Sequence, residues 1–479
     1  MADSRTSYYL PLLVVLSTYF IASKYVFDKV NSESGIIIDE LFHLPQGQLY
    51  CNRNFTYWDP KITTLPGLYI VSSALVGPYF DCTVYNLRFV NLLASCINLL
   101  LFSSILKYVY FNDNLKIVLQ ALSLALLPPL YFFSYVYYSD TLSITFLLAF
   151  SRLCLTNRYK FLMFIFGAFS ILMRQTNIAW IAMVFGHKFL DIFIKSSRVF
   201  GNVYITNIKL SKTSLIAQDV DSSKVKRYYD LGDVFQAMKY HLGTYFRTFF
   251  KFLIYQDFVT LLTHCILLIS FVVFVYINGS IVVGDKKAHE ATLHLPQLFY
   301  FSLFYGFFGL PYALAKLGST LKLIFSQKLR VFLLIIVCLV IVHFNTITHP
   351  YLLADNRHFT FYIWNRWFGK YEFAKYATVP VYVFLFYSLY DNLRDQNCIS
   401  FLLPYSVSTI LVLALQKLIE VRYFLVPYII LRLRFVRPSY KIVIFEFLWY
   451  VLINVAAFHV FFSRAVYWKD FDDAQRIIW

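Results

Sequence analysis

Two adjacent carboxylates, Asp39 and Glu40, follow the first apolar stretch of the chain, and His43 comes within one helical turn of them. A carboxylate in such a place can accept a proton from a hydroxyl nucleophile, and a nearby imidazole can donate or accept a hydrogen bond. Asp and Glu also favour helix N-termini, so the pair could simply mark the start of a helix. Because only 14% of the residues are charged, the pair is nevertheless a candidate for chemistry.

Further charged side chains, most of them cationic, recur later in the chain. Arg and Lys hold phosphate oxygens through charge-assisted hydrogen bonds, and Arg can bind two oxygens at once. Ionisable residues at membrane depth are costly and are functional candidates by default. The candidates are Asp59 and Lys61 in segment 58–69, Arg174 in segment 172–177, His349, Asp355, Arg357, His358 and Arg366 in segment 349–366, and Glu420 and Arg422 in segment 418–423.

Each of these groups also has a purely structural interpretation. Arg174 could be a snorkelling anchor at the membrane surface, and His43 a packing residue of its loop. The Glu420–Arg422 pair could hold a helix end. The 349–366 cluster is harder to explain by anchoring, because it combines two His, two Arg and an Asp. These residue types predict a polar, anion-binding site, and they do not distinguish an enzyme from a transporter.

The elements that must position these residues are membrane-spanning helices. The chain has 479 residues, of which 59% are hydrophobic and 20% aromatic. A spanning helix needs about 20 mostly apolar residues, and many stretches qualify. The first lacks a small-residue cleavage site, which predicts a retained signal anchor. The expected spans are 8–27, 85–107, 117–138, 140–155, 161–173, 178–194, 257–277, 297–315, 330–348, 376–390, 400–416, 425–437 and 443–462.

Basic loops predict how these spans are oriented. Most Lys and Arg residues behind the net charge of +17 lie in short loops between spans. This is the positive-inside pattern of membrane proteins, and it argues against a nucleic-acid-binding protein. With the N-terminus in the cytosol, the basic loop 195–250 becomes cytosolic only if residues 66–80 form an interfacial or re-entrant helix and not a span.

The same orientation predicts one polytopic membrane domain over residues 1–479. Its first lumenal loop is 28–84, which carries the paired carboxylates, and its lumenal polar loop is 349–372. The glycosylation sequons at Asn54 and Asn278 then both face the lumen, where oligosaccharide is attached. No soluble catalytic domain is visible, so any chemistry must occur at the membrane surface or within the bundle.

The seven cysteines show no metal-like spacing. Cys51 and Cys82 could both face an oxidising lumen and pair there. The odd count and the spacing alone leave that pairing open.

Taken together, these motifs resemble the eukaryotic dolichyl-phosphate-glucose α-1,2-glucosyltransferases. The resemblance covers essentially the whole chain, with the motifs in the expected order. It is carried by Asp39-Glu40-Leu41-Phe42-His43, by residues 58–69 and 349–364, and by Leu172-Met173-Arg174-Gln175-Thr176-Asn177 and Leu418-Ile419-Glu420-Val421-Arg422-Tyr423.

The resemblance implies an all-α polytopic protein with a GT-C type fold and about 12–13 transmembrane helices in the endoplasmic reticulum membrane, with a lumenal active site. Family members add the third and last glucose to the dolichyl-diphosphate-linked oligosaccharide that precedes N-glycosylation. Their donor is dolichyl β-D-glucosyl phosphate, and their product linkage is α-1,2, so the reaction inverts the anomeric centre. A single displacement of this kind needs one base and no covalent glycosyl intermediate.

GT-C enzymes commonly carry an essential acid in the first lumenal loop. Carried onto this chain, that points to Asp39 as the base, with Glu40 as the runner-up or its orienting neighbour. The expected stabilisers of the leaving phosphate are Lys61, Arg357, His358 and Arg422, and the residues expected to orient them or a sugar hydroxyl are Asp59 and Asp355.

The expected partners are the dolichyl-linked donor and acceptor lipids, with no nucleic acid and no indicated protein partner. We expect no cofactor and no metal, because cationic side chains could neutralise the phosphate. One alternative is a related dolichyl-phosphate-sugar transferase, since residue types do not distinguish the hexoses. Another is a non-catalytic regulator or a transporter on the same fold, although the internal repeats of many transporters are not visible here.

Overall fold

The computed structural model describes residues 2–110, 113–201, 230–286, 290–394, 397–435, 438–468 and 473–479. This part of the chain is mainly α-helical, which confirms the expected all-α class, and its one sheet has two strands. The expected cytosolic loop 195–250 lies partly outside the described residues, because they do not include 202–229.

The helices follow one another with mostly short connections. In the first half of the chain they are α1 (Ala2–Glu33), α2 (Glu40–Cys51), α3 (Gly67–Val76), α4 (Val84–Val109), α5 (Asn114–Ala125), α6 (Pro128–Phe133), α7 (Ser139–Thr156), α8 (Lys160–Met173), α9 (Asn177–Gly201) and α10 (Leu231–Gly243). The later elements are α11 (Arg247–Gln256), α12 (Phe258–Asn278), α13 (Pro296–Phe308), α14 (Leu310–Ala315), α15 (Leu317–Ser326), α16 (Lys328–Asn345), α17 (Pro350–Ala354), α18 (Phe359–Ile363), η1 (Trp364–Phe368), α19 (Ala374–Ala377), α20 (Val379–Leu393), α21 (Ile399–Leu413), η2 (Val421–Phe424), α22 (Leu425–Arg432), α23 (Tyr440–Ser463), β1 (Ala465–Val466) and β2 (Gln475–Arg476).

Six of the described helices are long and apolar enough to cross a membrane, which makes the chain a multi-pass membrane protein by length and composition. They are Ser7–Glu33, Val84–Val109, Asn177–Ser197, Phe258–Asn278, Lys328–Asn345 and Tyr440–Ser463. Of the other expected spans, 140–155 coincides with α7, an unbroken 18-residue helix outside this set, and the rest coincide with shorter or broken helices. The expected span 117–138, for example, divides into α5 and α6 where Pro128 and Pro129 begin a new helix, because proline cannot continue the hydrogen-bond ladder of a helix.

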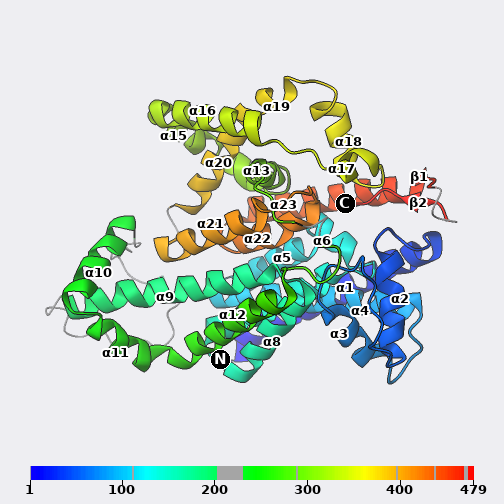
Figure 1. Ribbon diagram of the computed structural model, residues 1–479, viewed down its shortest axis with the longest axis horizontal. Coiled ribbons are helices and arrows are strands. Elements are labelled where there is room, and N and C mark those ends of the chain that lie inside the picture. The colour runs from blue at the N-terminus through cyan, green and yellow to red at the C-terminus, as the bar shows by residue number, and fades with distance from the viewer. Residues whose placement is uncertain are drawn as a thin grey trace.

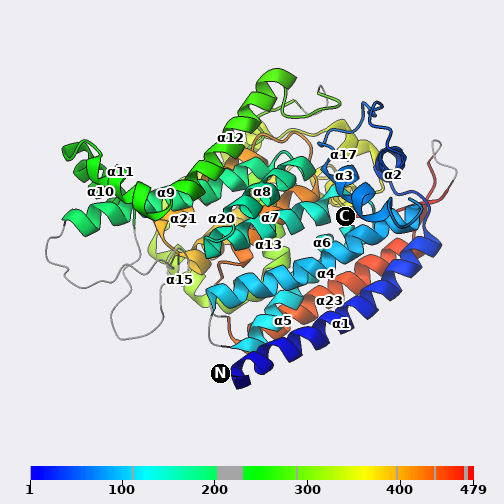
Figure 2. The same ribbon diagram turned by 90° about the horizontal axis from the view of Figure 1, so that it is seen from below.

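The bundle has two packed parts. Helices α1, α4, α5 and α23 run side by side along one edge, as Figure 2 shows, and their contacts are α1 with α4 and α5, and α5 with α23. Helix α7 packs on α4 and α8, and α9 packs on α12 and α21. A second part is formed by α13, α15, α16 and α20 (Figure 1). The apolar core of the first part continues into the tyrosine- and phenylalanine-rich helix α13 and into α22.

Short elements gather at one end of this bundle. Figure 1 shows α2, α3, α17, α18 and the two strands on the right, and α10 and α11 at the opposite end. The segments expected in the lumen therefore lie together. The described part of the expected cytosolic loop lies at the other end.

Helix α3 forms part of segment 66–80, which we expect to be interfacial or re-entrant. Its 10 residues extend about 15 Å, half of a bilayer core, so it is too short to span. A Cβ added at Gly67 would lie 2.6 Å from the backbone carbon of Leu172, so only glycine lets α3 approach the end of α8 this closely. The side-chain amide of Gln175 also donates to the carbonyl of Thr63, at 2.8 Å. These contacts fix segment 58–69 against segment 172–177.

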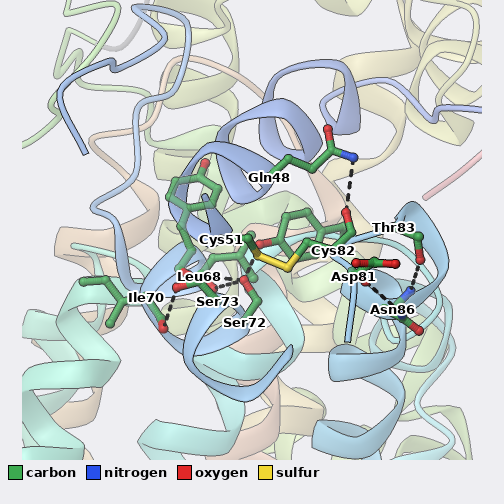
Figure 3. Close-up of a disulfide and its surroundings, with 12 residues drawn as sticks. Gln48, Cys51, Leu68, Ile70, Ser72, Ser73, Asp81, Cys82, Thr83 and Asn86 are labelled. Atoms are coloured by element: carbon green, nitrogen blue, oxygen red, sulfur yellow. Dashed lines mark hydrogen bonds between the residues drawn. A yellow bond between two sulfur atoms is a disulfide. The ribbon is translucent and has the colours of Figure 1, made fainter. Parts of the chain in front are cut away.

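A disulfide resolves the question that the cysteine spacing left open. Cys51, the last residue of α2, is bonded to Cys82, two residues before α4 (Figure 3). The side-chain amide of Gln48 donates to the Cys82 carbonyl, at 3.2 Å. The bond therefore closes the loop that contains segment 58–69 and anchors it to a long helix.

Candidate active site

Arg422 is the centre of an ion-pair cluster at the end of the bundle where the short elements gather. Its Nη2 lies 3.0 Å from Oδ2 of Asp39, and its Nε donates to Glu420. Its Nη1 lies 4.0 Å from Oδ2 of Asp140. Asp39 directly precedes α2, Arg422 belongs to η2, and Asp140 lies in the first turn of α7. Segments far apart in the sequence therefore supply one site.

Asp140 extends the cluster to a second guanidinium. Its Oδ1 pairs with Nη1 of Arg174, which lies between α8 and α9. The Asp140 side chain is 3% exposed, and its Oδ2 has no hydrogen-bond partner among the described residues. Sequence reasoning missed Asp140. The available signal was a lone charge between two apolar spans on the same predicted side as Asp39.

The backbone before Asp39 is held in an unusual conformation. Ile38 has a φ of 43°, in the left-handed region that β-branched residues rarely adopt. Such a residue costs about 1–3 kcal/mol and persists only where its surroundings impose it. Here the N–H of Asp39 donates to the hydroxyl of Tyr138 at 3.0 Å, and this hydroxyl donates to the carbonyl of Ile37 at 3.4 Å. The Tyr138 ring also lies 5.5 Å from the Arg422 guanidinium.

The charges around Asp39 keep its carboxylate ionised. Burial alone would raise the pKa of Asp39, but the positive charge of Arg422 lowers it below its ordinary value of 3.8. The side chain is 35% exposed, and its Oδ1 accepts no hydrogen bond from the described residues. Asp39 is therefore a charged acceptor with one oxygen open to a substrate hydroxyl.

Two neighbours of Asp39 are also shifted. Burial lowers the pKa of His43, which keeps its imidazole neutral, and its Nδ1 lies 2.6 Å from the Tyr69 hydroxyl. For Glu420, burial would raise the pKa, but Arg422 lowers it below the ordinary value. Both Glu420 and Asp39 therefore face Arg422 as carboxylates.

Glu40 points into the protein, unlike Asp39. It accepts two hydrogen bonds from Arg88, at 2.9 and 2.5 Å, and both side chains are almost completely buried. It also accepts the backbone N–H groups of Tyr137 at 2.6 Å and Ile37 at 3.0 Å. The expectation that Glu40 shares the catalytic role is not supported by this geometry, because its oxygens are occupied by partners that hold the Asp39 loop on α4 and on the segment between α6 and α7. The alternative of a structural Glu at a helix start fits Glu40.

Residues of the 349–366 cluster form two separate groups: Asp355 lies with Arg357 and His358, and His349 belongs to a helix cap. Asp355 accepts from Nε and Nη2 of Arg357, at 2.9 and 2.8 Å, and lies 3.8 Å from Nε2 of His358. His358 is the member that contributes to the electrostatics of Asp39. His349 caps α17 by accepting the N–H of Tyr351, at 3.2 Å.

Three other expected site residues are not brought to Arg422 by any described contact. The Arg366 side chain is exposed and lies 5.7 Å from the Tyr362 ring. Asp59 accepts the N–H of Lys61 at 2.8 Å and so shapes the turn, while the Lys61 amine lies 4.9 Å from the Phe42 ring.

The last segment of the described chain supports both loops around Asp39. After α23 the chain returns through β1 and β2, and Ile478 exchanges backbone hydrogen bonds with Arg357 and Phe359, at 2.8 and 3.0 Å. The Trp479 carbonyl lies 3.2 Å from Nδ1 of His358. The amide of Gln475 donates to the carbonyl of Ile36, at 3.2 Å. Nothing in the apolar pattern of the sequence indicated this return segment.

Two adjoining pockets lie beside the cluster. A polar pocket is lined by Asp140, Arg174, Asn177 and Arg422. An apolar pocket runs between α7, α9, α21 and α22 and reaches Lys188 and Arg434. Both pockets are lined by Ile144, Trp180 and Val426. The arrangement can take an anionic head group beside the guanidinium groups and a long apolar tail between the helices.

Metal-ligating side chains do not gather in the part of the chain described here, where no group of three or more His, Cys, Asp or Glu residues could hold a metal ion. Metal independence stays a prediction.

Comparison with known proteins gives a consistent result. The chain matches the family model described as the DIE2/ALG10 family over residues 34–433. A relative from Drosophila melanogaster is 40% identical over 462 residues, covering 95% of this chain and 96% of the relative. Relatives from Rattus norvegicus and Arabidopsis thaliana are 35% and 31% identical, each covering 92% of this chain and 93% and 94% of the relative. All three are named Dol-P-Glc:Glc(2)Man(9)GlcNAc(2)-PP-Dol alpha-1,2-glucosyltransferase. No solved structure matches the chain.

Proposed function

The chain belongs to the DIE2/ALG10 family, and we propose that it transfers glucose from dolichyl β-D-glucosyl phosphate to the 2-hydroxyl of the terminal glucose on a diglucosylated dolichyl-diphosphate oligosaccharide. This is the last step of lipid-linked oligosaccharide assembly for N-glycosylation. The observation that carries the proposal is the near full-length match to relatives that are all named for this reaction.

Asp39 is the proposed base. Its open Oδ1 accepts the proton of the acceptor 2-hydroxyl while the hydroxyl oxygen forms a bond to the anomeric carbon of the donor glucose. The bond from that carbon to the phosphate oxygen breaks, and dolichyl phosphate leaves from the opposite face. One displacement inverts the β-linked donor to an α-linked product, so a second carboxylate nucleophile is not required.

Arg422 and Arg174 are the proposed stabilisers of the leaving phosphate. The ion pairs Asp39–Arg422–Asp140–Arg174 form a continuous chain with the base at one end and a guanidinium at the other. Preorganised cations act most strongly on charge that develops in the transition state. Asp140 orients both guanidiniums towards the polar pocket. His358, when protonated, adds positive potential near the base.

The two pockets suggest how the donor lies. The phosphate occupies the polar pocket and the dolichyl chain enters the apolar pocket, where burial of its methyl and methylene groups is favourable. Along α7, the apolar pocket runs from Ile144 to Leu155, which extends about 16 Å, so this pocket suits an extended lipid better than a free sugar. The acceptor oligosaccharide approaches the exposed side of Asp39.

The proposed location is the endoplasmic reticulum membrane, with the site facing the lumen. The family and the positive-inside distribution of Lys and Arg support this orientation. The partners are the donor and acceptor lipids. No further partner is proposed.

Transfer by the purified protein tests this function. The protein would be incubated with dolichyl phosphate glucose and the diglucosylated lipid-linked acceptor, and the product would be digested with an α-1,2-specific glucosidase. We expect one added, glucosidase-sensitive glucose. Two control substrates are tested in the same way: dolichyl phosphate mannose replaces the donor, and a monoglucosylated lipid-linked oligosaccharide replaces the acceptor. Efficient transfer from either would favour a related sugar transferase, and no transfer by well-folded protein would favour a non-catalytic role.

A further inference from the structure

The two sequons of the chain differ in whether the side-chain amide nitrogen of the asparagine donates hydrogen bonds within the protein. Asn54 follows α2, after Arg53, whose φ of 57° turns the chain away from the helix. The carbonyl oxygen of the Asn54 side chain accepts the N–H of Thr56 at 3.2 Å and the Thr56 hydroxyl at 2.8 Å. The Asn54 Nδ2 donates to no described residue, and residues 52–57 are all exposed. The amide nitrogen of this sequon is therefore presented to solvent.

Asn278 is arranged differently. It is the last residue of α12, one of the helices long enough to span a membrane. Its Nδ2 donates to the carbonyls of Ser280 and Val282, both at 2.8 Å, so both amide hydrogens are used. Freeing the amide would leave these two carbonyls, which lie in the loop after α12, without a partner that they now have.

We propose that Asn54 is an N-glycosylation site of this protein and that Asn278 is not. The proposal rests on the lumenal orientation in the proposed function. Two observations support it: the Asn54 side chain is exposed and its amide nitrogen donates to no described residue, whereas the Asn278 amide nitrogen donates two hydrogen bonds.

The modification is a group transfer by the oligosaccharyltransferase of the endoplasmic reticulum, with a lipid-diphosphate oligosaccharide as donor. The Asn54 Nδ2 forms a bond to the anomeric carbon of the first sugar and loses one proton to a base. The bond from that carbon to the diphosphate oxygen breaks, and the lipid diphosphate leaves with the electron pair. The Thr56 hydroxyl, already bonded to the Asn54 side-chain oxygen, favours the geometry in which the nitrogen is presented.

A glycan at Asn54 is compatible with the active site. Asp39 lies immediately before the first residue of α2, and Asn54 lies beyond its last residue, so the 12-residue helix separates them by about 18 Å. The disulfide from Cys51 to Cys82 fixes this end of α2. The glycan therefore projects from the far end of the loop and leaves the open side of Asp39 accessible.

Gel mobility of the full chain before and after endoglycosidase treatment tests the proposal. The protein is expressed in a eukaryotic cell with an N-terminal epitope tag. The variants are Asn54→Gln and Thr56→Ala, which destroy the first sequon, Thr56→Ser, which preserves it, and Asn278→Gln, which destroys the second. Size-exclusion profiles and glucosyl transfer are measured on the same samples.

We expect one endoglycosidase-sensitive shift in wild type, Thr56→Ser and Asn278→Gln, and its loss in Asn54→Gln and Thr56→Ala. An unshifted but active wild type would overturn the proposal while leaving the enzyme assignment intact. A shift that survives Asn54→Gln, or a second shift that Asn278→Gln removes, would also overturn it. A shifted but inactive wild type would support the modification and count against the proposed function.

Discussion

Arg422 and Asp39, 383 residues apart in the sequence, form an ion pair with 3.0 Å between Nη2 and Oδ2. The pair joins the loop before α2 to the segment before α22. Arg422 also contacts Glu420 and approaches Asp140, so one guanidinium links the proposed base to the polar pocket. This position gives Arg422 two effects, one on the charge of the base and one on the leaving phosphate.

Replacing Arg422 with Gln should move the acid limb of the pH–rate profile to higher pH. Loss of the positive charge disfavours the Asp39 carboxylate and raises its pKa, so the base is protonated earlier as the pH falls. An opposite charge at this range lowers a carboxyl pKa by about 1–3 units, which sets the expected shift. The measurement is kcat/KM for glucosyl transfer against pH.

Arg174→Gln is the matched control for that experiment. It removes a guanidinium from the same pocket, but one that is paired with Asp140 and not with Asp39. We expect a lower rate with little movement of the acid limb. An unmoved limb in Arg422→Gln would mean that Arg422 does not set the protonation of the base.

Asp140→Asn should lower kcat about 10- to 100-fold in a protein that still folds. The substitution keeps the shape of the side chain but removes the charge that orients Arg174 and Arg422, and small displacements of catalytic groups have effects of about this size. Asp140→Glu should restore part of the rate. Ser139→Ala, at the neighbouring buried position, is the control. Wild-type kinetics in Asp140→Asn would rule out a positioning role.

Glu40→Gln should destabilise the protein. Removing one partner of a buried ion pair typically costs about 3–5 kcal/mol, and Glu40 also accepts two backbone N–H groups. The thermal unfolding midpoint should fall clearly, whereas Asp39→Asn, at a partly exposed side chain, should change it little. If Glu40→Gln kept its stability but lost glucosyl transfer, the result would support a catalytic role for Glu40.

Much of this site follows from sequence features, and the rest depends on the tertiary fold. The carboxylates after the first span indicated the Asp39 loop, and the short run interrupted by Pro78 indicated that residues 66–80 form only a short helix, as α3 is. Sequence could not separate Asp39 from Glu40, because the left-handed backbone at Ile38 and the position of Arg88 decide which side chain faces inward. The role of Asp140 depends on contacts with distant segments.

Removing the disulfide should loosen the loop that carries segment 58–69. Cys51 and Cys82 are separated by 31 residues, and a cross-link over such a loop contributes about 3–4 kcal/mol in the chain-entropy model. The double variant Cys51→Ser/Cys82→Ser should therefore have a lower unfolding midpoint. Cys265→Ser, at a free cysteine, is the control. Equal thiol labelling of wild type before and after reduction would contradict the pairing.

The most direct test of the account is glucosyl transfer by purified wild type and Asp39→Asn, each with and without a chelator, with unfolding midpoints measured on the same samples. The account predicts that wild type transfers equally well in both conditions and that Asp39→Asn remains folded but loses transfer by about 100-fold or more, as expected when a general base is removed. Substantial transfer by Asp39→Asn would contradict the assignment of Asp39 as the base. Loss of wild-type transfer in the chelator, restored by added divalent cations, would contradict the metal-free mechanism.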